Sequence, residues 1–171
     1  MASPDVQPNL CYFRTMKSWQ EFIGRTPEEY DRWITEVGKE AAEFEIAELL
    51  RISADKQVIV DTNIPLDVLK EISDYDHVAV LVSPQAMSVE YFFEREDEEK
   101  KFIKEQIALA NDPVKAMENY KNCIARVNSK EHYDEYVNSG FFIIHRTDPL
   151  VDTKAEVLGK LETHFKLVHR S

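Results

Sequence analysis

Three short apolar runs constrain the fold of this 171-residue chain more than any other feature. They are VIV at residues 58–60, VAVLV at 78–82 and FFII at 141–144. Each run is nearly continuous in apolar character, which is typical of strands covered by helices on both faces. The connections carry helical patterns, so we expect parallel pairing through right-handed crossovers. The sequence therefore predicts an α/β fold with a parallel sheet of about three strands covered by helices.

A long amphipathic helix is predicted from residue 26 to about residue 50. Thr26, Pro27 and Glu29 form a start signal, because the threonine and glutamate side chains satisfy free amides and proline suits the first helical position. Apolar residues then recur at three- and four-residue spacing. A kink is expected at Gly38.

Further helix boundaries follow from capping residues, prolines and glycines. Residues 1–25 are predicted to be irregular with at most one short helix. We predict a short helix at residues 65–73 and a long helical stretch within residues 88–138. The long stretch is expected to break at 111–113 and at 128–129 and to stop at Gly140. A last helix should follow a second capping box at 152–156.

Composition limits the classes of partner. The chain has 21 basic and 32 acidic residues, and its formal charge of -11 disfavours nucleic acids and anionic membranes. Cys11 and Cys123 are far apart and suggest neither a disulfide framework nor a zinc site. No apolar run approaches membrane-spanning length. A single cytoplasmic domain over residues 1–171 is therefore expected.

Asp61 follows the first apolar run in VIVDTNIP, residues 58–65. A carboxylate at the carboxyl end of a strand can hold Mg²⁺ through water or accept a proton from a substrate hydroxyl. Alternatively, Asp61 and Asn63 close the turn and cap the helix after Pro65. Spacing alone leaves both interpretations open.

Arg95 lies in the charged segment after the second apolar run, at residues 88–107. A guanidinium on a helical flap can clamp a phosphoryl group that is being transferred. The alternative is a solvated helix face with Glu and Lys four residues apart, as in Glu96 and Lys100.

A basic and aromatic patch stands out near the N-terminus of this acidic chain. Its cations are Arg14, Lys17 and Arg25, and four aromatic residues are interleaved with them: Tyr12, Phe13, Trp19 and Phe22. Such a patch can form a small-molecule pocket or an aromatic lid over the core with solvated basic tips. Arg126 can face the same pocket or pair with an acid. The five histidines have neither zinc spacing nor a local nucleophile and are interpreted as structural.

The order of VIVDTNIP, VAVLVSP, FFERED and FFIIHRTD resembles the later part of P-loop nucleoside and nucleotide kinases. The resemblance implies ATP and Mg²⁺ as cofactors, a nucleoside-like or other small hydroxyl acceptor, and catalytic roles for Asp61 and Arg95, with Asp61 holding the metal indirectly. It also implies nucleotide binding by Arg146, Thr147 and Asp148, and acceptor binding by Arg14, Lys17 and Arg25.

The phosphate loop of that family, G-x-x-x-x-G-K-[ST], is missing here. We therefore expect a kinase-like domain that lacks the N-terminal strand-loop-helix unit and is inactive as this chain. The missing strand would lie between residues 58–62 and 78–82. The sheet is then expected to close directly, rearrange, or take a strand from a partner in a homodimer or by strand exchange.

Two other functions stay open. VIVDTNI also resembles the first strand of PIN-domain ribonucleases, in which the aspartate starts a metal-binding carboxylate cluster. Here Asp148 and Asp152 follow the last apolar run, but no acid follows VAVLVSP. The third possibility is a non-enzymatic remnant that binds a ligand or a partner protein.

Overall fold

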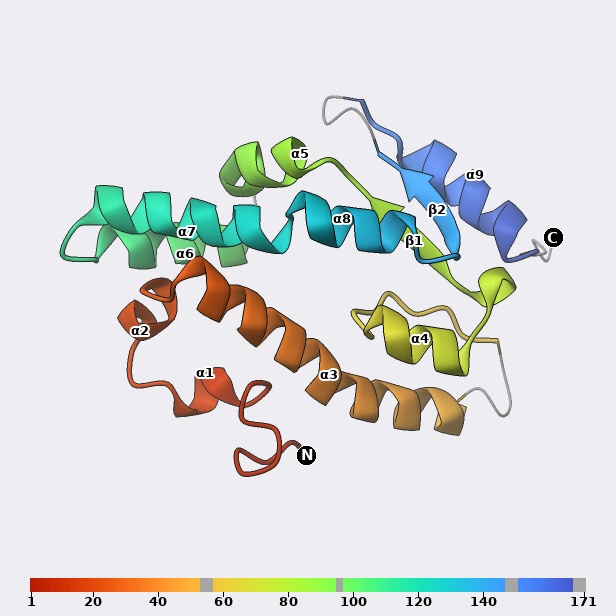
Figure 1. Cartoon of the computed structure of the whole chain (residues 1–171), viewed down its shortest axis with the longest axis horizontal. Coiled ribbons are helices and arrows are strands. Elements are labelled where there is room, and N and C mark those ends of the chain that lie inside the picture. The colour runs from red at the N-terminus through yellow and green to blue at the C-terminus, as the bar shows by residue number, and fades with distance from the viewer. Residues whose placement is uncertain (53–56, 95–96, 147–150, 168–171) are drawn as a thin grey trace.

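The computed structural model describes residues 1–52, 57–94, 97–146 and 151–167, and most of this chain is helical (Figure 1). The helices are α1 (Tyr12–Thr15), α2 (Trp19–Ile23), α3 (Pro27–Ile52), α4 (Leu66–Ile72), η1 (Tyr75–His77), α5 (Gln85–Glu90), η2 (Phe92–Glu94), α6 (Glu98–Ala108), α7 (Pro113–Val127), α8 (Lys130–Val137) and α9 (Lys154–His164). The strands are β1 (Ala79–Val82) and β2 (Phe142–His145).

The start of α3 confirms the predicted capping box. The backbone N–H of Thr26 donates to Glu29 Oε2 at 2.9 Å, and the N–H of Glu29 donates to Thr26 Oγ1 at 3.2 Å. The helix continues through Gly38 without a break. Before it, the N-terminal segment contains two short helices, α1 and α2, where one at most was expected.

The helix boundaries after residue 97 follow their capping residues. Asp112 accepts from the N–H of Lys115 and begins α7, and Ser129 accepts from the N–H of His132 and begins α8. Gly140 follows α8 with a φ of 88°, a left-handed conformation that favours glycine. The second capping box does not form, because Thr153 makes no side-chain hydrogen bond at the start of α9 within the described chain.

The sheet is small and parallel, which confirms a mixed α/β structure. β1 pairs with β2 in a register that matches Ala79 with Phe142 and Val82 with His145. The N–H of Arg146 continues the ladder by donating to Val82 O at 2.8 Å. Helix α8 contacts β1, and α9 contacts β2.

The expected third strand at residues 58–60 is absent, so the prediction of about three strands was wrong for the described chain. Residues 57–61 are without regular structure and make no backbone hydrogen bond to another described residue. β-Branched residues favour extended backbone, but a strand also needs a neighbour to hydrogen-bond with. Residues 57–61 pair with neither β1 nor β2, so in the described chain this segment has none.

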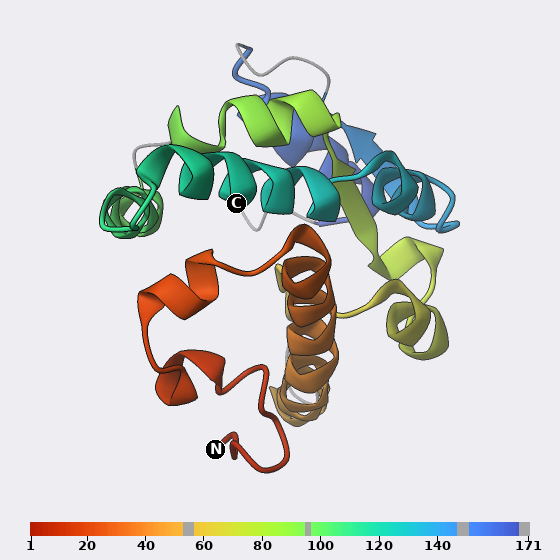
Figure 2. The same ribbon diagram turned by 60° about the vertical axis from the view of Figure 1, so that its left-hand side comes forward.

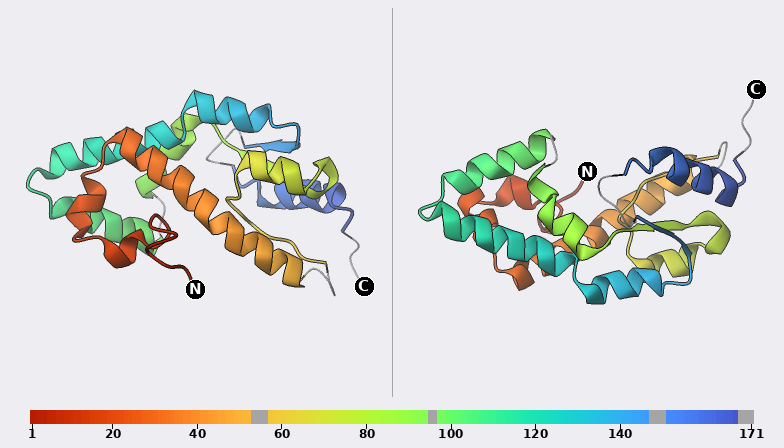
Figure 3. Two further views of the ribbon diagram at one scale, coloured as in Figure 1. Left: turned by 60° about the horizontal axis from the view of Figure 1, so that its bottom comes forward. Right: turned by 90° about the horizontal axis from the view of Figure 1, so that it is seen from above.

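The principal core is helical and lies away from the sheet. Phe22, Tyr30, Ile107 and Tyr120 are among its buried residues and come from α2, α3, α6 and α7. Figure 3 shows α2, α6 and α7 at one end of the molecule and the sheet with α9 at the other, while α3 runs from the first end toward the second. Within the described ranges, no helix combines the length and apolar character needed to cross a bilayer.

Candidate functional site

A pocket of about 440 Å³ lies between the N-terminal segment, α2 and the first turns of α3. In Figure 2, α1 and α2 are folded along one side of α3. The pocket is lined by Asn9, Tyr12, Glu21, Arg25, Glu29, Arg32, Trp33 and Glu36. The four lining residues of α3 are spaced three and four apart and so share one helix face. This volume is in the range of small-molecule sites.

The backbone at Arg25 is fixed by α7. Arg25 lies in the short link between α2 and α3, where its carbonyl oxygen accepts from Asn119 Nδ2 at 2.8 Å and from Cys123 Sγ at 3.5 Å. Asn119 Nδ2 also donates to Ile23 O at 3.2 Å. These contacts set the position from which the Arg25 side chain enters the pocket.

The Arg25 guanidinium is held by aromatic rings. Its Cζ lies 3.9 Å from the ring centroid of Tyr12, 4.9 Å from that of Trp33 and 5.5 Å from that of Phe22. Arg25 Nη1 and Tyr12 Oη are buried, and neither has a hydrogen-bond partner among the described residues. Cation–π contact stabilises the charge but does not satisfy an N–H donor. Arg25, a residue of the pocket wall, therefore carries a buried cationic donor that lacks an acceptor among the described residues.

The Tyr12 hydroxyl stays protonated beside this guanidinium. Burial is the main cause of its raised pKa; the Glu21 carboxylate raises that pKa further, whereas Arg25 opposes the shift. The phenol is therefore a neutral donor near pH 7. Tyr12 and Arg25 can both donate to the same bound group.

The carboxylates of the pocket have partners of their own. Glu21 accepts from the N–H of Lys17 at 3.1 Å, and Glu36 pairs with Lys39 Nζ at 2.9 Å. Glu29 forms the capping box described above. Exposed Arg32 makes no hydrogen bond or ion pair to another residue in the described part of the chain. The two guanidinium groups are thus the unpaired charges of the pocket.

Only one cation of the predicted basic and aromatic patch reaches the pocket. Arg14 is exposed, and its Nη1 donates to Ala2 O at 3.4 Å. Lys17 is exposed as well. Arg25 lines the pocket, so the predicted patch does not act as one unit: two of its cations face solvent and the third belongs to the pocket.

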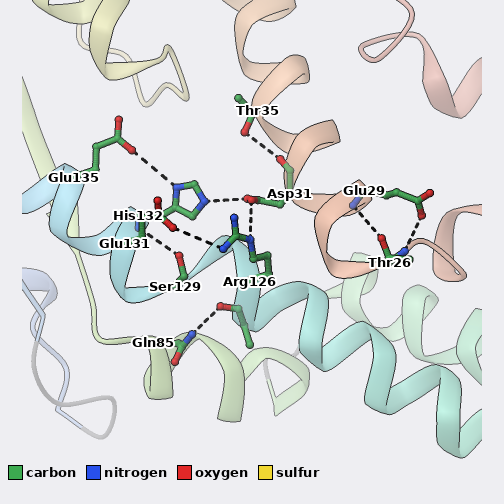
Figure 4. Close-up of polar contacts among 11 residues, drawn as sticks. Thr26, Glu29, Asp31, Thr35, Gln85, Arg126, Ser129, Glu131, His132 and Glu135 are labelled. Carbon is green, nitrogen blue, oxygen red and sulfur yellow. Dashed lines mark hydrogen bonds and ion pairs between the residues drawn. The ribbon is translucent and has the colours of Figure 1, made fainter.

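Arg126 belongs to a separate ion cluster on another face of α3 (Figure 4). Its Nε lies 3.0 Å from Asp31 Oδ2, and His132 Nε2 lies 3.0 Å from Asp31 Oδ1. Glu135 lies 4.0 Å from the other ring nitrogen of His132. Carboxylates thus lie at both ring nitrogens of His132, and the ion pairs of the cluster join α3, α7 and α8. Arg126 pairs with an acid, one of its two predicted alternatives.

Asp61 is exposed in the irregular segment before α4. Thr62, rather than Asp61 or Asn63, closes the turn, since its Oγ1 accepts from the N–H of Ile64 at 3.0 Å and contacts Glu45. The described residues contain no group of three or more His, Cys, Asp or Glu side chains arranged to hold a metal. Mg²⁺ held through water by Asp61 stays a prediction of the kinase resemblance.

The predicted nucleotide-binding turn is described only at its start. Arg146 is exposed, and its backbone N–H is used in the ladder to Val82. Thr147, Asp148 and the predicted lid residue Arg95 lie outside the described residues.

A second hollow of about 520 Å³ lies between β2 and α9. The charged residues that line it are engaged: Lys160 pairs with Glu156, and His164 Nε2 lies 3.2 Å from Val78 O. The His164 ring also stacks on Phe142, with centroids 4.2 Å apart. The charged groups of this hollow are therefore already paired, whereas the pocket around Arg25 has donors without partners among the described residues.

Sequence reasoning missed several pocket residues on α3. Arg32, Trp33 and Glu36 have the three- and four-residue spacing of Glu29, so the helical period offered a signal. Asp31 and His132 are 101 positions apart and offered none.

Comparisons with models of protein families, with curated proteins and with solved structures returned no match. The contacts around Arg25 are therefore the basis for assigning a function.

Proposed function

We propose that this chain binds a small, hydroxylated anionic molecule, of the sugar phosphate or nucleotide class, in the pocket around Arg25. The observation that carries the proposal is the buried Nη1 of Arg25, which has no acceptor among the described residues. A phosphate oxygen is a suitable acceptor, because charge-assisted bonds from guanidinium are short and strong. The Tyr12 hydroxyl, buried and also without a partner, supplies a second donor.

Other lining residues support a ligand that also carries hydroxyl groups. Arg32 adds positive charge to the pocket, while the carboxylates of Glu21 and Glu36 keep acceptor capacity for ligand hydroxyls. Sugar phosphates and nucleotides combine these groups. The volume of about 440 Å³ suits a molecule of that size.

The kinase resemblance supports the same class of ligand. In that family, the segment that precedes the long helix receives the phosphoryl acceptor, and here Tyr12 and Arg25 are in that segment. Phosphoryl transfer stays a prediction of the resemblance, because this sequence has no phosphate loop. Our proposal is therefore an acceptor-type binding site without phosphotransfer by this chain.

Isothermal titration calorimetry tests this proposal with AMP and ribose 5-phosphate, and with adenosine and ribose as uncharged counterparts. We expect the phosphorylated compounds to bind about tenfold or more tightly than their counterparts, and Arg25→Gln to remove this difference. Arg14→Gln is the matched control, because Arg14 is a nearby arginine outside the pocket. Unchanged affinity in a folded Arg25→Gln variant, or no phosphate-dependent binding, would overturn the proposal.

A further inference from the structure

Residues 57–60, Gln-Val-Ile-Val, have the composition of a β-strand but pair with no other strand of the described chain. Ile59 is 64% exposed and Val60 is 47% exposed, although both are large apolar residues. Their backbone groups make no hydrogen bond to another described residue. An exposed β-branched segment with unused N–H and C=O groups is a template for pairing with another chain.

The other half of a pairing site is the free edge of β1. β1 hydrogen-bonds to β2 on one side, and no third strand is present in the described chain to occupy the other side. Leu81, in the middle of β1, is 58% exposed. A strand added at this edge would place its side chains beside Leu81 and shield it from water.

The total accessible surface indicates how much area a partner has available to cover. The 171-residue chain exposes 11,919 Å². A compact monomer of 19.9 kDa is expected to expose about 8,700 Å². The excess is larger than the roughly 800 Å² that each partner contributes to an interface of standard size. A stable dimer therefore requires only part of it.

We propose that two copies of this chain pair symmetrically, residues 57–60 of each copy adding to the free edge of β1 in its partner. Each chain supplies both an unpaired segment and an unpaired edge. A two-fold axis therefore pairs the segment of each copy with the edge of the other and leaves no site open for a third copy. Ile59 or Val60 of one copy then covers Leu81 of the other. The interaction is independent of the pocket around Arg25.

Charge sets the conditions for this dimer. Each copy has a formal charge of -11, which opposes association at low salt. Residues 57–60 carry no charge, so the contact itself is apolar. We expect dimerisation to strengthen as salt is raised toward about 0.15 M, where charges more than about 8 Å apart are largely screened.

Sedimentation velocity over roughly 1–100 μM provides the first test, since it covers the affinities of ordinary dimers. The full chain is expected to show a concentration-dependent dimer that Ile59→Lys removes. Val114→Lys is the matched control: it adds the same charge at a side chain that is 80% exposed and lies at the start of α7. A monomer throughout this range, or a dimer unaffected by Ile59→Lys, would overturn the proposal.

Disulfide trapping tests the partner strand directly. One preparation carries Val60→Cys and the other Leu81→Cys, while the native Cys11 and Cys123 are buried. Mixing them under oxidising conditions is expected to give a covalent heterodimer, whereas Val60→Cys mixed with Val114→Cys should give none. Equal cross-linking in both mixtures would contradict pairing at β1.

Discussion

His132 Nε2 lies 3.0 Å from Asp31 Oδ1, although these residues are 101 positions apart. Asp31 also receives Arg126 Nε at 3.0 Å, and its side chain is only 15% exposed. One carboxylate on α3 is therefore the shared partner of a cation on α7 and an imidazole on α8. Removing it leaves two polar groups without their common acceptor.

We predict that Asp31→Ala lowers the free energy of unfolding by about 1–3 kcal/mol, because removing a largely buried carboxylate shared by two partners costs more than losing an exposed pair. Urea denaturation followed by circular dichroism measures the change. Asp134→Ala is the control, since its ion pair with Lys130 is exposed and should contribute less than about 1 kcal/mol. Equal losses in the two variants would contradict the structural role of Asp31.

Asn119 is predicted to support ligand binding from outside the pocket. Its side-chain amide holds the carbonyl groups of Ile23 and Arg25. Asn119→Ala should lower affinity for a phosphorylated ligand about three- to tenfold, because the Arg25 backbone loses a hydrogen bond that positions it. Calorimetry measures the effect, with Asn122→Ala as the control at an exposed position of α7. Unchanged affinity would show that the pocket does not depend on this contact.

The core should lose stability at alkaline pH. Burial raises the pKa of the Cys123 thiol from 9.0 to about 11, and it also raises the pKa values of Tyr30 and Tyr120. The unfolded chain then loses these protons at lower pH than the folded chain does. The resulting stabilisation is complete well below pH 9, where all three groups are protonated in both states. The Cys123 contribution declines as pH rises through 9.0, where the unfolded thiol ionises, and is lost as pH passes about 11.

Urea denaturation at successive pH values from 8 to 11 measures this loss (roughly one pH unit per step). Cys123→Ala should lower the free energy of unfolding at every pH. It should also make that free energy decline less steeply between pH 9 and 10, because in this range the thiol of the unfolded chain ionises before the tyrosines do. A decline as steep as that of the unsubstituted chain would assign the alkaline sensitivity to other groups.

Gly159 in α9 is a predicted site for stabilisation. A Cβ atom there meets nothing within 4 Å, so alanine adds helix propensity without a clash. Gly159→Ala should raise the free energy of unfolding by about 0.5–1 kcal/mol. At Gly38, a Cβ would lie 3.2 Å from Asn63 O, so Gly38→Ala should gain less. Denaturation curves of both variants test the comparison.

Phosphoryl transfer from ATP is not expected from this chain, because its sequence has no phosphate loop. An assay for ADP with Mg²⁺ and each candidate acceptor should give the buffer rate, both before and after Asp61→Asn. ADP formation abolished by Asp61→Asn would instead support a complete kinase site. Mn²⁺-dependent RNA cleavage abolished by Asp61→Ala would support the ribonuclease alternative.

Local signals in the sequence predicted much of the helical structure. The Thr26 and Glu29 capping box, Asp112 before Pro113, and Gly140 after α8 each act within a few residues, so their effects can be inferred from spacing. The parallel pairing of β1 with β2 was also predicted.

Predictions that depended on distant neighbours fared less well. The run at 58–60 has a strand's composition, but composition cannot supply the adjacent strand that its backbone requires. Arg14, Lys17 and Arg25 are close in sequence, yet only Arg25 lines the pocket, because Asn119 on α7 fixes its backbone there. Contacts between residues far apart in the sequence thus determine which of these cations lines the pocket, and the spacing of nearby residues does not predict such contacts.

The register that places Ala79 opposite Phe142 has a consequence for the order of folding. Every helix from α5 to α8 lies between these two residues in the chain, so the sheet can close only after a long loop of polypeptide has been brought together. Contacts of such long sequence separation slow folding. We expect the helical core to form first and hydrogen-exchange protection of β1 and β2 to appear late during refolding.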